Sequence, residues 1–159
     1  MLREQIYFVD LDRCFSPRCG MDDPLKKAKE KAAATYDAAA DHFDDEPLGF
    51  WDFVGKRTID NLKLPAGAKV LDVGCGTGAS ALPAAQAVGK NGSVVGVDLA
   101  SRLLERARAK ALAAGLDNVE FRLADMTALN YPDESFDAVI SVFSIFFVPD
   151  MEGVGSPVL

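Results

Sequence analysis

Hydrophobic residues recur along the first third of the chain with the spacing of amphipathic helices. From Leu25 to Phe43, apolar side chains repeat at three- and four-residue steps, which predicts a helix with one buried stripe. Asp23 and Pro24 stand where a helix N-cap and a first-turn proline are favoured. A second run of this period, Phe50 to Leu62, stops before Pro65. Two helices are therefore expected ahead of the first strand.

Beyond residue 67 the pattern changes to short β-branched runs that alternate with helical stretches. This alternation is typical of right-handed crossovers and an open parallel sheet. The expected strands are Val70 to Val73, Ser93 to Asp98, Val119 to Leu123 and Ala138 to Phe143, with helices at Ala79 to Val88 and Leu103 to Leu112. The predicted fold class is α/β, a Rossmann-like open parallel sheet with helices on both faces, preceded by two N-terminal helices.

Composition places the chain among ordinary globular proteins. Its 159 residues are 49% hydrophobic and 26% charged, which suits one core and excludes disordered, collagen-like and disulfide-stapled classes. We expect an irregular, dispensable leader over residues 1–22 and one partial catalytic domain over residues 23–159. The longest apolar run, near Ala138 to Val148, is about half of what a membrane span needs.

Charge and cysteine content narrow the set of partners. Twenty-four acidic and 17 basic residues give a net charge of -7, which repels nucleic acids and anionic membranes. Cys14, Cys19 and Cys75 are too few for a disulfide framework and lack the companion ligands of a zinc site. The sequence thus favours a cytoplasmic protein without a metal, a nucleic-acid partner or a membrane span.

The segment VLDVGCGTG, residues 70–78, gives the strongest chemical signal. A buried strand leads into a turn containing Gly74, Gly76 and Gly78, and then into a helix. Glycines allow a ligand to approach the backbone, and a helix N-terminus offers unpaired N–H groups and a positive dipole to an anionic group. In an open parallel sheet this turn lies at the carboxyl ends of the strands, where ligands bind. A tight strand-to-helix turn also needs glycine for its own geometry.

Acidic residues follow the next two strands. Asp98 ends the second strand, where a carboxylate can accept both hydroxyls of a ribose; the alternative is a helix cap. Asp125 follows the third strand beside Met126, and this pair could hold an adenine. The acid would accept from the amino group while the thioether covers the ring, and a loop cap is the alternative for Asp125.

In this order and spacing, the motifs resemble those of the class I S-adenosylmethionine-dependent methyltransferases. The resemblance rests on VLDVGCGTG (70–78), VGVD (95–98), ADM (124–126) and PDESFDAV (132–139), and it extends from about Ala28 to Pro149. The last motif and the helix containing Tyr36 and Asp37 are similar to the branch that methylates small molecules, including ubiquinone and menaquinone precursors.

The resemblance implies S-adenosyl-L-methionine as the cofactor and a small molecule as the methyl acceptor. It assigns Gly74, Gly76 and Gly78 to the methionine part, Asp98 to the ribose, Asp125 and Met126 to the adenine, and Tyr36 to a helix that closes over the cofactor. Asp72, within the first motif, is counted with these cofactor-binding residues. No residue is identified as a catalytic base.

Other functions remain as alternatives. The spacing of Gly74, Gly76 and Ala79, with the acid Asp98 about twenty residues further on, also fits the fingerprint of a nicotinamide dinucleotide site. The extra Gly78, the two leading helices and Asp125 favour the methyltransferase.

Relatives of this kind continue with a further helix and strands that complete the sheet and much of the acceptor pocket. The C-terminal strands are therefore expected to be missing here, which would leave the strand at Ala138 to Phe143 as an open apolar edge prone to self-association. A cofactor-binding fragment with little or no methyl transfer is the corresponding alternative.

The remaining polar residues favour structural roles. His42 is expected to face solvent or cap a helix, and Cys75 to be a small buried filler. The charged residues Glu105, Arg106, Arg108 and Lys110 are interpreted as the solvated face of their helix.

Overall fold

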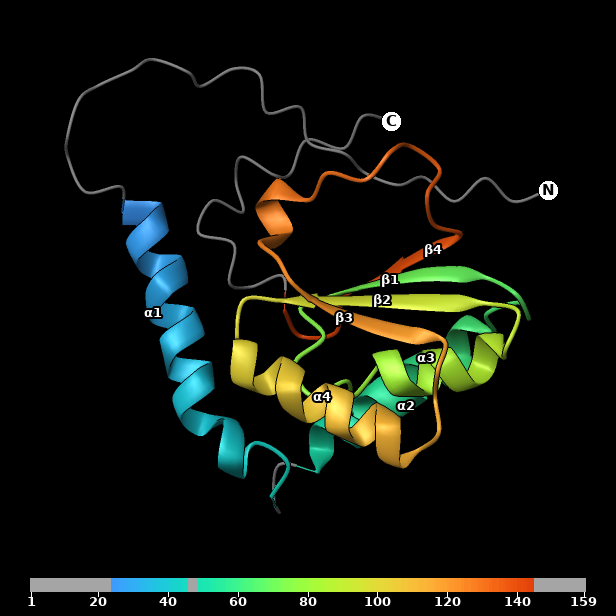
Figure 1. Cartoon of the computed structure of the whole chain (residues 1–159), viewed down its shortest axis with the longest axis horizontal. Helices are drawn as coiled ribbons and strands as arrows, with labels where there is room; N and C mark the ends of the chain where they lie inside the picture. Colours follow the sequence, from blue (N-terminus) through green and yellow to red (C-terminus); the bar gives the residue numbers. More distant parts are fainter. Residues whose placement is uncertain (1–23, 46–48, 145–159) are drawn as a thin grey trace.

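The structure, a computed structural model, describes residues 24–45 and 49–144 (Figure 1). Its elements are α1 (Pro24–Ala39), the 3-10 helix η1 (Ala40–His42), α2 (Phe50–Leu62), β1 (Lys69–Val73), α3 (Ala81–Val88), β2 (Ser93–Asp98), α4 (Ser101–Ala113), β3 (Val119–Leu123), the 3-10 helix η2 (Met126–Ala128) and β4 (Ala138–Ile140). The predicted leader over residues 1–22 and the cap at Asp23 lie outside the described residues.

The four strands form one parallel sheet in the order β3-β2-β1-β4. Val94 pairs with Val70 on one side and Val119 on the other, and Val70 in turn pairs with Ala138. Paired residues of parallel strands share a face, and on this face they join the main hydrophobic core. The core therefore lies between the sheet and the helices that pack on it.

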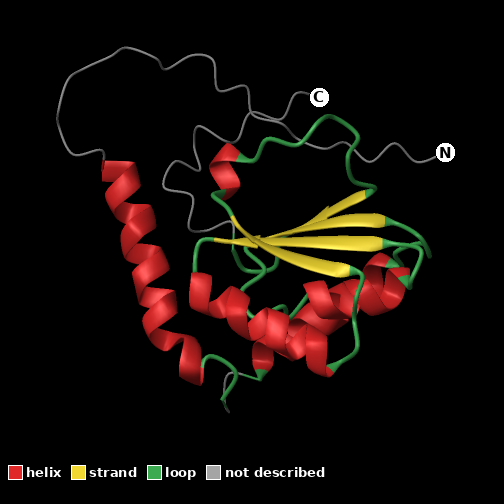
Figure 2. Ribbon diagram, viewed as in Figure 1, coloured by secondary structure: helices red, strands yellow, loops and turns green. Residues whose placement is uncertain are grey.

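The helices are arranged on both sides of the sheet, as predicted. The α-helices α2, α3 and α4 cover one side, and the 3-10 helix η2 with its loop lies over the other (Figure 2). Helix α1 stands beside the carboxyl ends of the strands (Figure 1). None of the described helices is long and apolar enough to cross a membrane.

Element boundaries test the sequence predictions in detail. The predicted ranges of α2, β2 and β3 are confirmed. The first helix is shorter than predicted, because a 3-10 turn replaces it after Ala39. The strand predicted as far as Phe143 ends at Ile140, and Phe143 adopts a left-handed φ of 57° that breaks extended geometry. Strand β4 is one of the two edge strands of the described sheet, and self-association through it stays a prediction.

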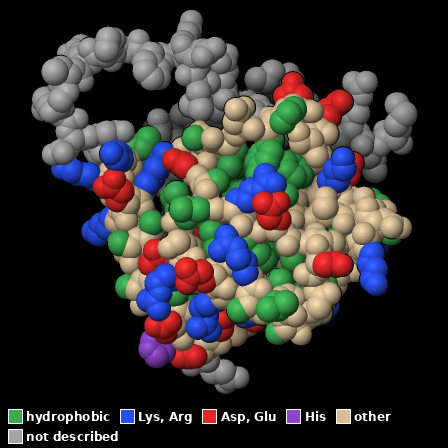
Figure 3. All heavy atoms as spheres, viewed as in Figure 1, with side chains coloured by type: hydrophobic (Ala, Val, Ile, Leu, Met, Phe, Trp, Pro, Cys, Tyr) green, Lys and Arg blue, Asp and Glu red, His purple; other side chains and the backbone are tan. Residues whose placement is uncertain are grey.

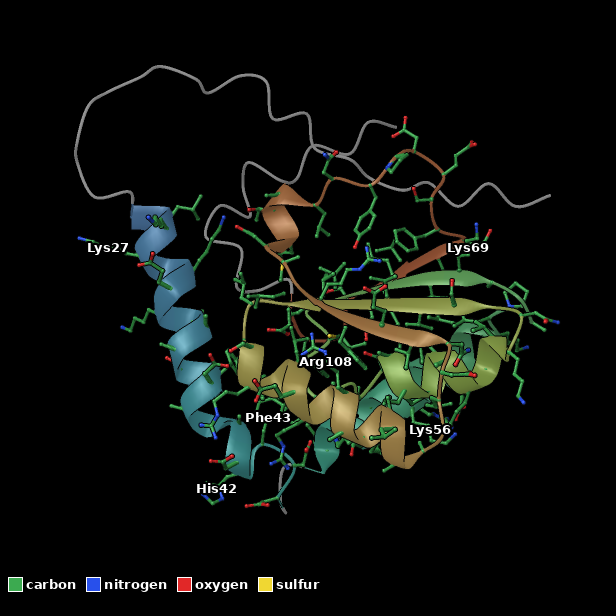
Figure 4. All side chains as sticks on the ribbon, viewed as in Figure 1. Lys27, His42, Phe43, Lys56, Lys69 and Arg108 are labelled. Carbon is green, nitrogen blue, oxygen red and sulfur yellow. The ribbon has the colours of Figure 1, made fainter. Side chains whose placement is uncertain are left out.

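The charged face predicted on α4 is only partly solvated. Glu105 is exposed, but Arg108 donates from Nη2 to the carbonyl oxygen of Phe121 at 2.6 Å, beneath the sheet (Figure 4). Arg106 and Lys110 bind the carboxylate of Asp44. Arg108 is nevertheless exposed, as predicted. The prediction was wrong for Arg106 and Lys110, because helical periodicity identifies a face but not the distant segment that packs on it.

Helix α2 meets the glycine turn through a close backbone contact at Gly55. Gly55 is buried, and a β-carbon at this position would overlap the carbonyl group of Ala79, the residue that follows the turn. Ile59, one turn further along, is buried in the main core. The small residue thus lets α2 lie directly against the end of the turn.

This contact predicts that Gly55→Ala destabilises the fold by about 1–3 kcal/mol, since the backbone of Ala79 must move to admit the methyl group. Gly49→Ala, just before the same helix, is the matched control because a β-carbon there would have no atom within 4 Å. Urea denaturation of both variants measures the difference. Equal unfolding free energies would contradict the close packing.

Candidate functional site

A cavity opens at the carboxyl ends of β1, β2 and β3, with helix α1 along one side. The turn after β1, the loops after β2 and β3, and the aromatic residues of the N-terminal segment all contribute to its lining. The lining residues are Ala32, Ala33, Tyr36, Phe43, Trp51, Gly74, Cys75, Gly76, Thr77, Ala79, Ser80, Val97, Asp98, Leu99, Ala100, Leu103, Ala124, Met126, Val142, Phe143 and Ser144. Three strand ends therefore meet at one site, as the motif order predicts.

The glycine turn forms the floor of this cavity. Gly74, Gly76 and Gly78 have φ values of 71°, 53° and 90°, a region that glycine adopts without strain. A β-carbon at Gly74 would also overlap the side chain of Ser144, which donates from its hydroxyl to the carbonyl of Val73 at 2.7 Å. Glycine at position 74 is thus required by both backbone conformation and space.

The backbone amides of the turn are already hydrogen-bonded within the protein. Gly74 and Cys75 donate to the carbonyl of Val97 at 2.8 and 3.0 Å, and Gly76 donates to Oδ2 of Asp98 at 2.9 Å. Gly78 donates to the carbonyl of Cys75 at 2.8 Å. These four amides are therefore not the unpaired N–H groups that were expected at the helix N-terminus. The turn instead binds the end of β2.

Asp98 lies at the junction of the turn and β2. Its second oxygen, Oδ1, accepts from the amide of Ala100 at 2.9 Å, so the helix-cap alternative is realised together with a place in the cavity lining. Burial raises the pKa of Asp98, against the lowering effect of the backbone amides that it accepts from. The carboxylate thus faces the cavity with both oxygens held in fixed positions.

Asp125 and Met126 follow β3 but point differently. Met126 lines the cavity, whereas Asp125 does not. Asp125 accepts from Lys29 of α1 at 2.7 Å and from the amide and hydroxyl of Thr127 at 2.9 and 2.8 Å. Burial opposes ionisation of Asp125, but these hydrogen bonds outweigh it and lower its pKa. The loop-cap alternative therefore holds for Asp125, with an added ion pair to α1.

Asp72 lies behind the turn rather than in the cavity. Its side chain is fully buried, accepts from the hydroxyl of Ser80 at 2.7 Å through Oδ2, and leaves Oδ1 without a hydrogen-bond partner. Burial is the main reason that the pKa of Asp72 rises to about 7, and the charge of Asp98 adds to it. Ser80, the residue that donates to this acid, lines the cavity, whereas Asp72 does not.

Aromatic residues form one wall of the cavity. Phe43 stacks on Trp51 with ring centroids 6.3 Å apart and meets Tyr36 edge-on at 6.0 Å. Trp51 in turn meets Phe143 edge-on at 5.3 Å. Phe43 points from the end of α1 toward α4, whereas His42 next to it points away from the protein (Figure 4). His42 is exposed, as predicted, and lies 2.8 Å from Asp45.

The structure brings together most of the residues that the sequence singled out. Tyr36, Gly74, Gly76, Asp98 and Met126 line the cavity, whereas Asp72, Gly78 and Asp125 support its edges without lining it. Sequence reasoning did not identify Phe43, Trp51, Thr77, Ser80, Phe143 or Ser144 as lining residues. The aromatic residues in the predicted N-terminal helices were the available signal.

Two further chemistries find little support among the residues that the structure describes. Burial raises the pKa of the Cys75 thiol well above its usual value, which disfavours the nucleophilic thiolate. Within residues 24–45 and 49–144, no group of three His, Cys, Asp or Glu side chains could hold a metal ion.

Comparison with known proteins identifies the class to which this fold and site correspond. The family described as "Methyltransferase domain" matches residues 70–155, a little over half of the chain. The chain belongs to this methyltransferase family.

Individual relatives agree with this assignment. Aklanonic acid methyltransferase DauC of Streptomyces sp. (strain C5) is 35% identical over 125 residues, covering 79% of this chain and 57% of the relative. Demethylmenaquinone methyltransferase of Shouchella clausii is 39% identical over 95 residues, covering 60% and 40%. A SAM-dependent methyltransferase from Aquifex aeolicus has the same fold, with a TM-score of 0.63, 24% identity, and coverage of 74% and 62%. The chain spans about half the length of the curated relatives it matches.

The buried acid behind the turn predicts a pH-dependent stability. Since the folded-state pKa of Asp72 is raised from 3.8 to about 7, folding favours its protonated form. The unfolding free energy should therefore fall as pH rises from about 4 to 7, by about 4 kcal/mol, and then level off. Asp72→Asn should abolish this component and be more stable than the parent chain at pH 8.

Chemical denaturation at pH 5 and pH 8 measures the effect. Asp117→Asn, at an exposed position before β3, is the control and should keep the pH dependence of the parent. An unchanged pH dependence in Asp72→Asn would show that another group is responsible.

Proposed function

We propose that this chain binds S-adenosylmethionine in the cavity at the carboxyl ends of β1 to β3, as the cofactor-binding part of an enzyme that methylates a small apolar molecule. The observation that supports this most directly is the meeting of the glycine turn, Asp98 and Met126 at one cavity. Membership of the methyltransferase family and the two named relatives point to the same class of reaction. A cytoplasmic location remains part of the proposal.

The lining suits the parts of this cofactor in order. Gly74 and Gly76, which have no side chains to obstruct a ligand, would hold the methionine part. Asp98 would accept from the ribose hydroxyls, because each carboxylate oxygen has capacity beyond the one amide that it now accepts from. Met126 would cover one face of the adenine with its thioether. The bound cofactor supplies an activated methyl group on a sulfonium.

Asp125 has a more limited place in this proposal. Its carboxylate already holds Lys29 and Thr127, and its side chain is 27% exposed. An adenine amino group would have to share Asp125 with Lys29, or displace the ammonium group from it. We therefore expect Asp125 to tie α1 to the edge of the site and to contact the adenine only secondarily.

The aromatic wall indicates the nature of the acceptor. Trp51, Phe43 and Phe143 present ring surfaces to the cavity, and such surfaces favour apolar, planar molecules. Transfer of a methyl group from a sulfonium is an in-line displacement, so the main task of the protein is to hold the acceptor at attack distance and exclude water. The wall would serve both purposes without a dedicated base.

A nicotinamide dinucleotide is disfavoured by the hydrogen bonding of the turn. A pyrophosphate at a glycine-rich turn is bound by backbone N–H groups. Here the amides of Gly74, Cys75 and Gly76 donate to Val97 and Asp98, so these three groups are already hydrogen-bonded within the protein. These bonds favour S-adenosylmethionine over a dinucleotide, whereas the glycine spacing and the acid at the end of β2 fit both.

The cofactor assignment predicts tighter binding of S-adenosylmethionine, or of its demethylated product, than of NAD. Asp98→Ala should weaken binding by about 1.5–3 kcal/mol, the usual loss when hydrogen bonds to a charged group disappear. Calorimetry measures both effects. Quenching of Trp51, the one tryptophan of the chain, provides a second measurement because its ring lines the cavity.

The matched control is Asp117→Ala, which should bind the cofactor as the parent does. Asp41, on the first helix, is unsuitable as a control because it accepts two hydrogen bonds from Arg102 at 2.7 Å. Tighter binding of NAD would contradict the proposed function. Equal effects of the substitutions at Asp98 and Asp117 would show that Asp98 does not bind the cofactor.

Methyl transfer itself requires a separate assay. Labelled S-adenosylmethionine is incubated with the chain and with apolar aromatic acceptors, including the two compounds that the relatives are named for. A labelled product supports transfer to a small molecule. Tight cofactor binding without any labelled product favours the alternative of a cofactor-binding part that does not turn over by itself.

A further inference from the structure

Acidic residues at the end of α1 and in the segment after it face basic residues of α4. On the visible face of the protein, positive and negative side chains alternate where these two segments meet (Figure 3). The contacts join Asp37 to Arg102, Asp41 to Arg102, and Asp44 to both Arg106 and Lys110. The basic residues are spaced four apart and thus lie on one stripe of α4.

These contacts differ in their distance from solvent. The pair of Asp41 and Arg102 is at the surface, with 64% and 46% of the side chains exposed, and pairs of that kind add little stability. Asp44 is only 18% exposed. The contacts of Asp44 are therefore the ones in this stripe whose charges are screened least by solvent.

Asp44 also reaches the glycine turn. Its Oδ1 accepts from the hydroxyl of Thr77 and from Nζ of Lys110, both at 2.8 Å, and its Oδ2 accepts from Nε and Nη2 of Arg106 at 3.2 and 3.1 Å. Lys110 donates to the Thr77 hydroxyl as well, at 3.3 Å, and lies 3.6 Å from Asp52. Thr77 is 2% exposed and lies between Gly76 and Gly78.

We propose that Asp44 is a positioning residue for the cofactor site: through Thr77 it fixes the conformation of the glycine turn, and through its neighbour Phe43 it fixes the aromatic wall. The effect on ligand binding rests on the proposed function. Asp44 itself does not line the cavity, whereas Thr77 and Phe43 do. Burial opposes ionisation of Asp44, but the hydrogen bonds from Lys110 and Thr77 outweigh it and keep its pKa below the usual value.

The test compares Asp44→Ala, Thr77→Val and the double variant with Asp45→Ala. Asp45 is the next residue along the chain, is largely exposed, and pairs with the exposed His42. Three quantities are measured: the dissociation constant of S-adenosylhomocysteine, amide hydrogen exchange of residues 74–80 in the ligand-free protein, and the melting temperature.

We expect Asp44→Ala and Thr77→Val each to weaken binding and to speed exchange in the turn by about tenfold, the usual effect of losing a hydrogen bond to a charged group. The double variant should be little worse than Asp44→Ala, because both changes remove the same contact. Asp45→Ala should bind within about twofold of the parent. If Asp44 served stability alone, Asp44→Ala would lower the melting temperature, but its effect on affinity would not depend on whether Thr77 is also substituted.

Three results would overturn the proposal. In the first, Asp44→Ala leaves both affinity and exchange in the turn unchanged. In the second, the two single effects multiply in the double variant, which shows that Asp44 does not act through Thr77. In the third, Asp44→Ala does not fold and Thr77→Val, tested in its place, matches the parent.

Failure of the proposed function is distinguishable from failure of this inference. If the parent chain does not bind the ligand, the cofactor assignment fails. The exchange rates of residues 74–80 in the ligand-free variants still show whether Asp44 controls the turn.

Discussion

The site depends on a carboxylate that joins two loops, the one after β1 and the one after β2. Asp98 accepts from the amide of Gly76 on one side and from the amide of Ala100 on the other, each at 2.9 Å. The amides of Gly74 and Cys75 add two bonds to the carbonyl of Val97. These bonds fix the glycine turn against the end of β2 and the start of α4, so the protein's own hydrogen bonds hold the floor of the cavity in place.

This construction places two carboxyl groups close together near the floor. Asp72 lies buried behind the turn with one oxygen unpaired, and the charge of Asp98 helps to raise its pKa to about 7. Burying like charges close together is unfavourable, and an approaching cation relieves the repulsion. A positively charged group near Asp98, such as the sulfonium of the proposed cofactor, would therefore meet a favourable environment.

Much of the fold could be predicted because local patterns determine it. The period of the apolar residues predicted α2, and the short β-branched runs predicted β2 and β3 with their correct bounds. The alternation of strands with helices then predicted that the glycine turn, Asp98 and Met126 meet at the carboxyl ends of the strands. These residues are separated widely along the chain, but parallel topology places the ends of their strands together.

The parts that could not be predicted depend on contacts between distant segments. Arg106 and Lys110 have the spacing of a solvated helix face, and the sequence does not show that Asp44, more than 60 residues earlier, covers it. The same holds for Phe43 and Trp51, whose helical spacing is equally typical of ordinary core residues. The ion pair of Asp125 with Lys29 could not be predicted either, because the two residues lie 96 positions apart.

These distant contacts hold the N-terminal helix across the cavity at both of its ends. Lys29, in the second turn of α1, binds Asp125 at the end of β3, and Asp44, beyond the other end of the helix, binds Thr77 in the turn after β1. Ala32, Ala33 and Tyr36 lie between these two anchors and line the cavity. Each anchor is a partly buried network: Lys29 binds both Asp125 and the hydroxyl of Thr127, and Asp44 binds Thr77, Arg106 and Lys110. The position of α1 beside the cavity therefore depends on charged contacts with two different loops, so a substitution in either network is felt at the same cavity wall.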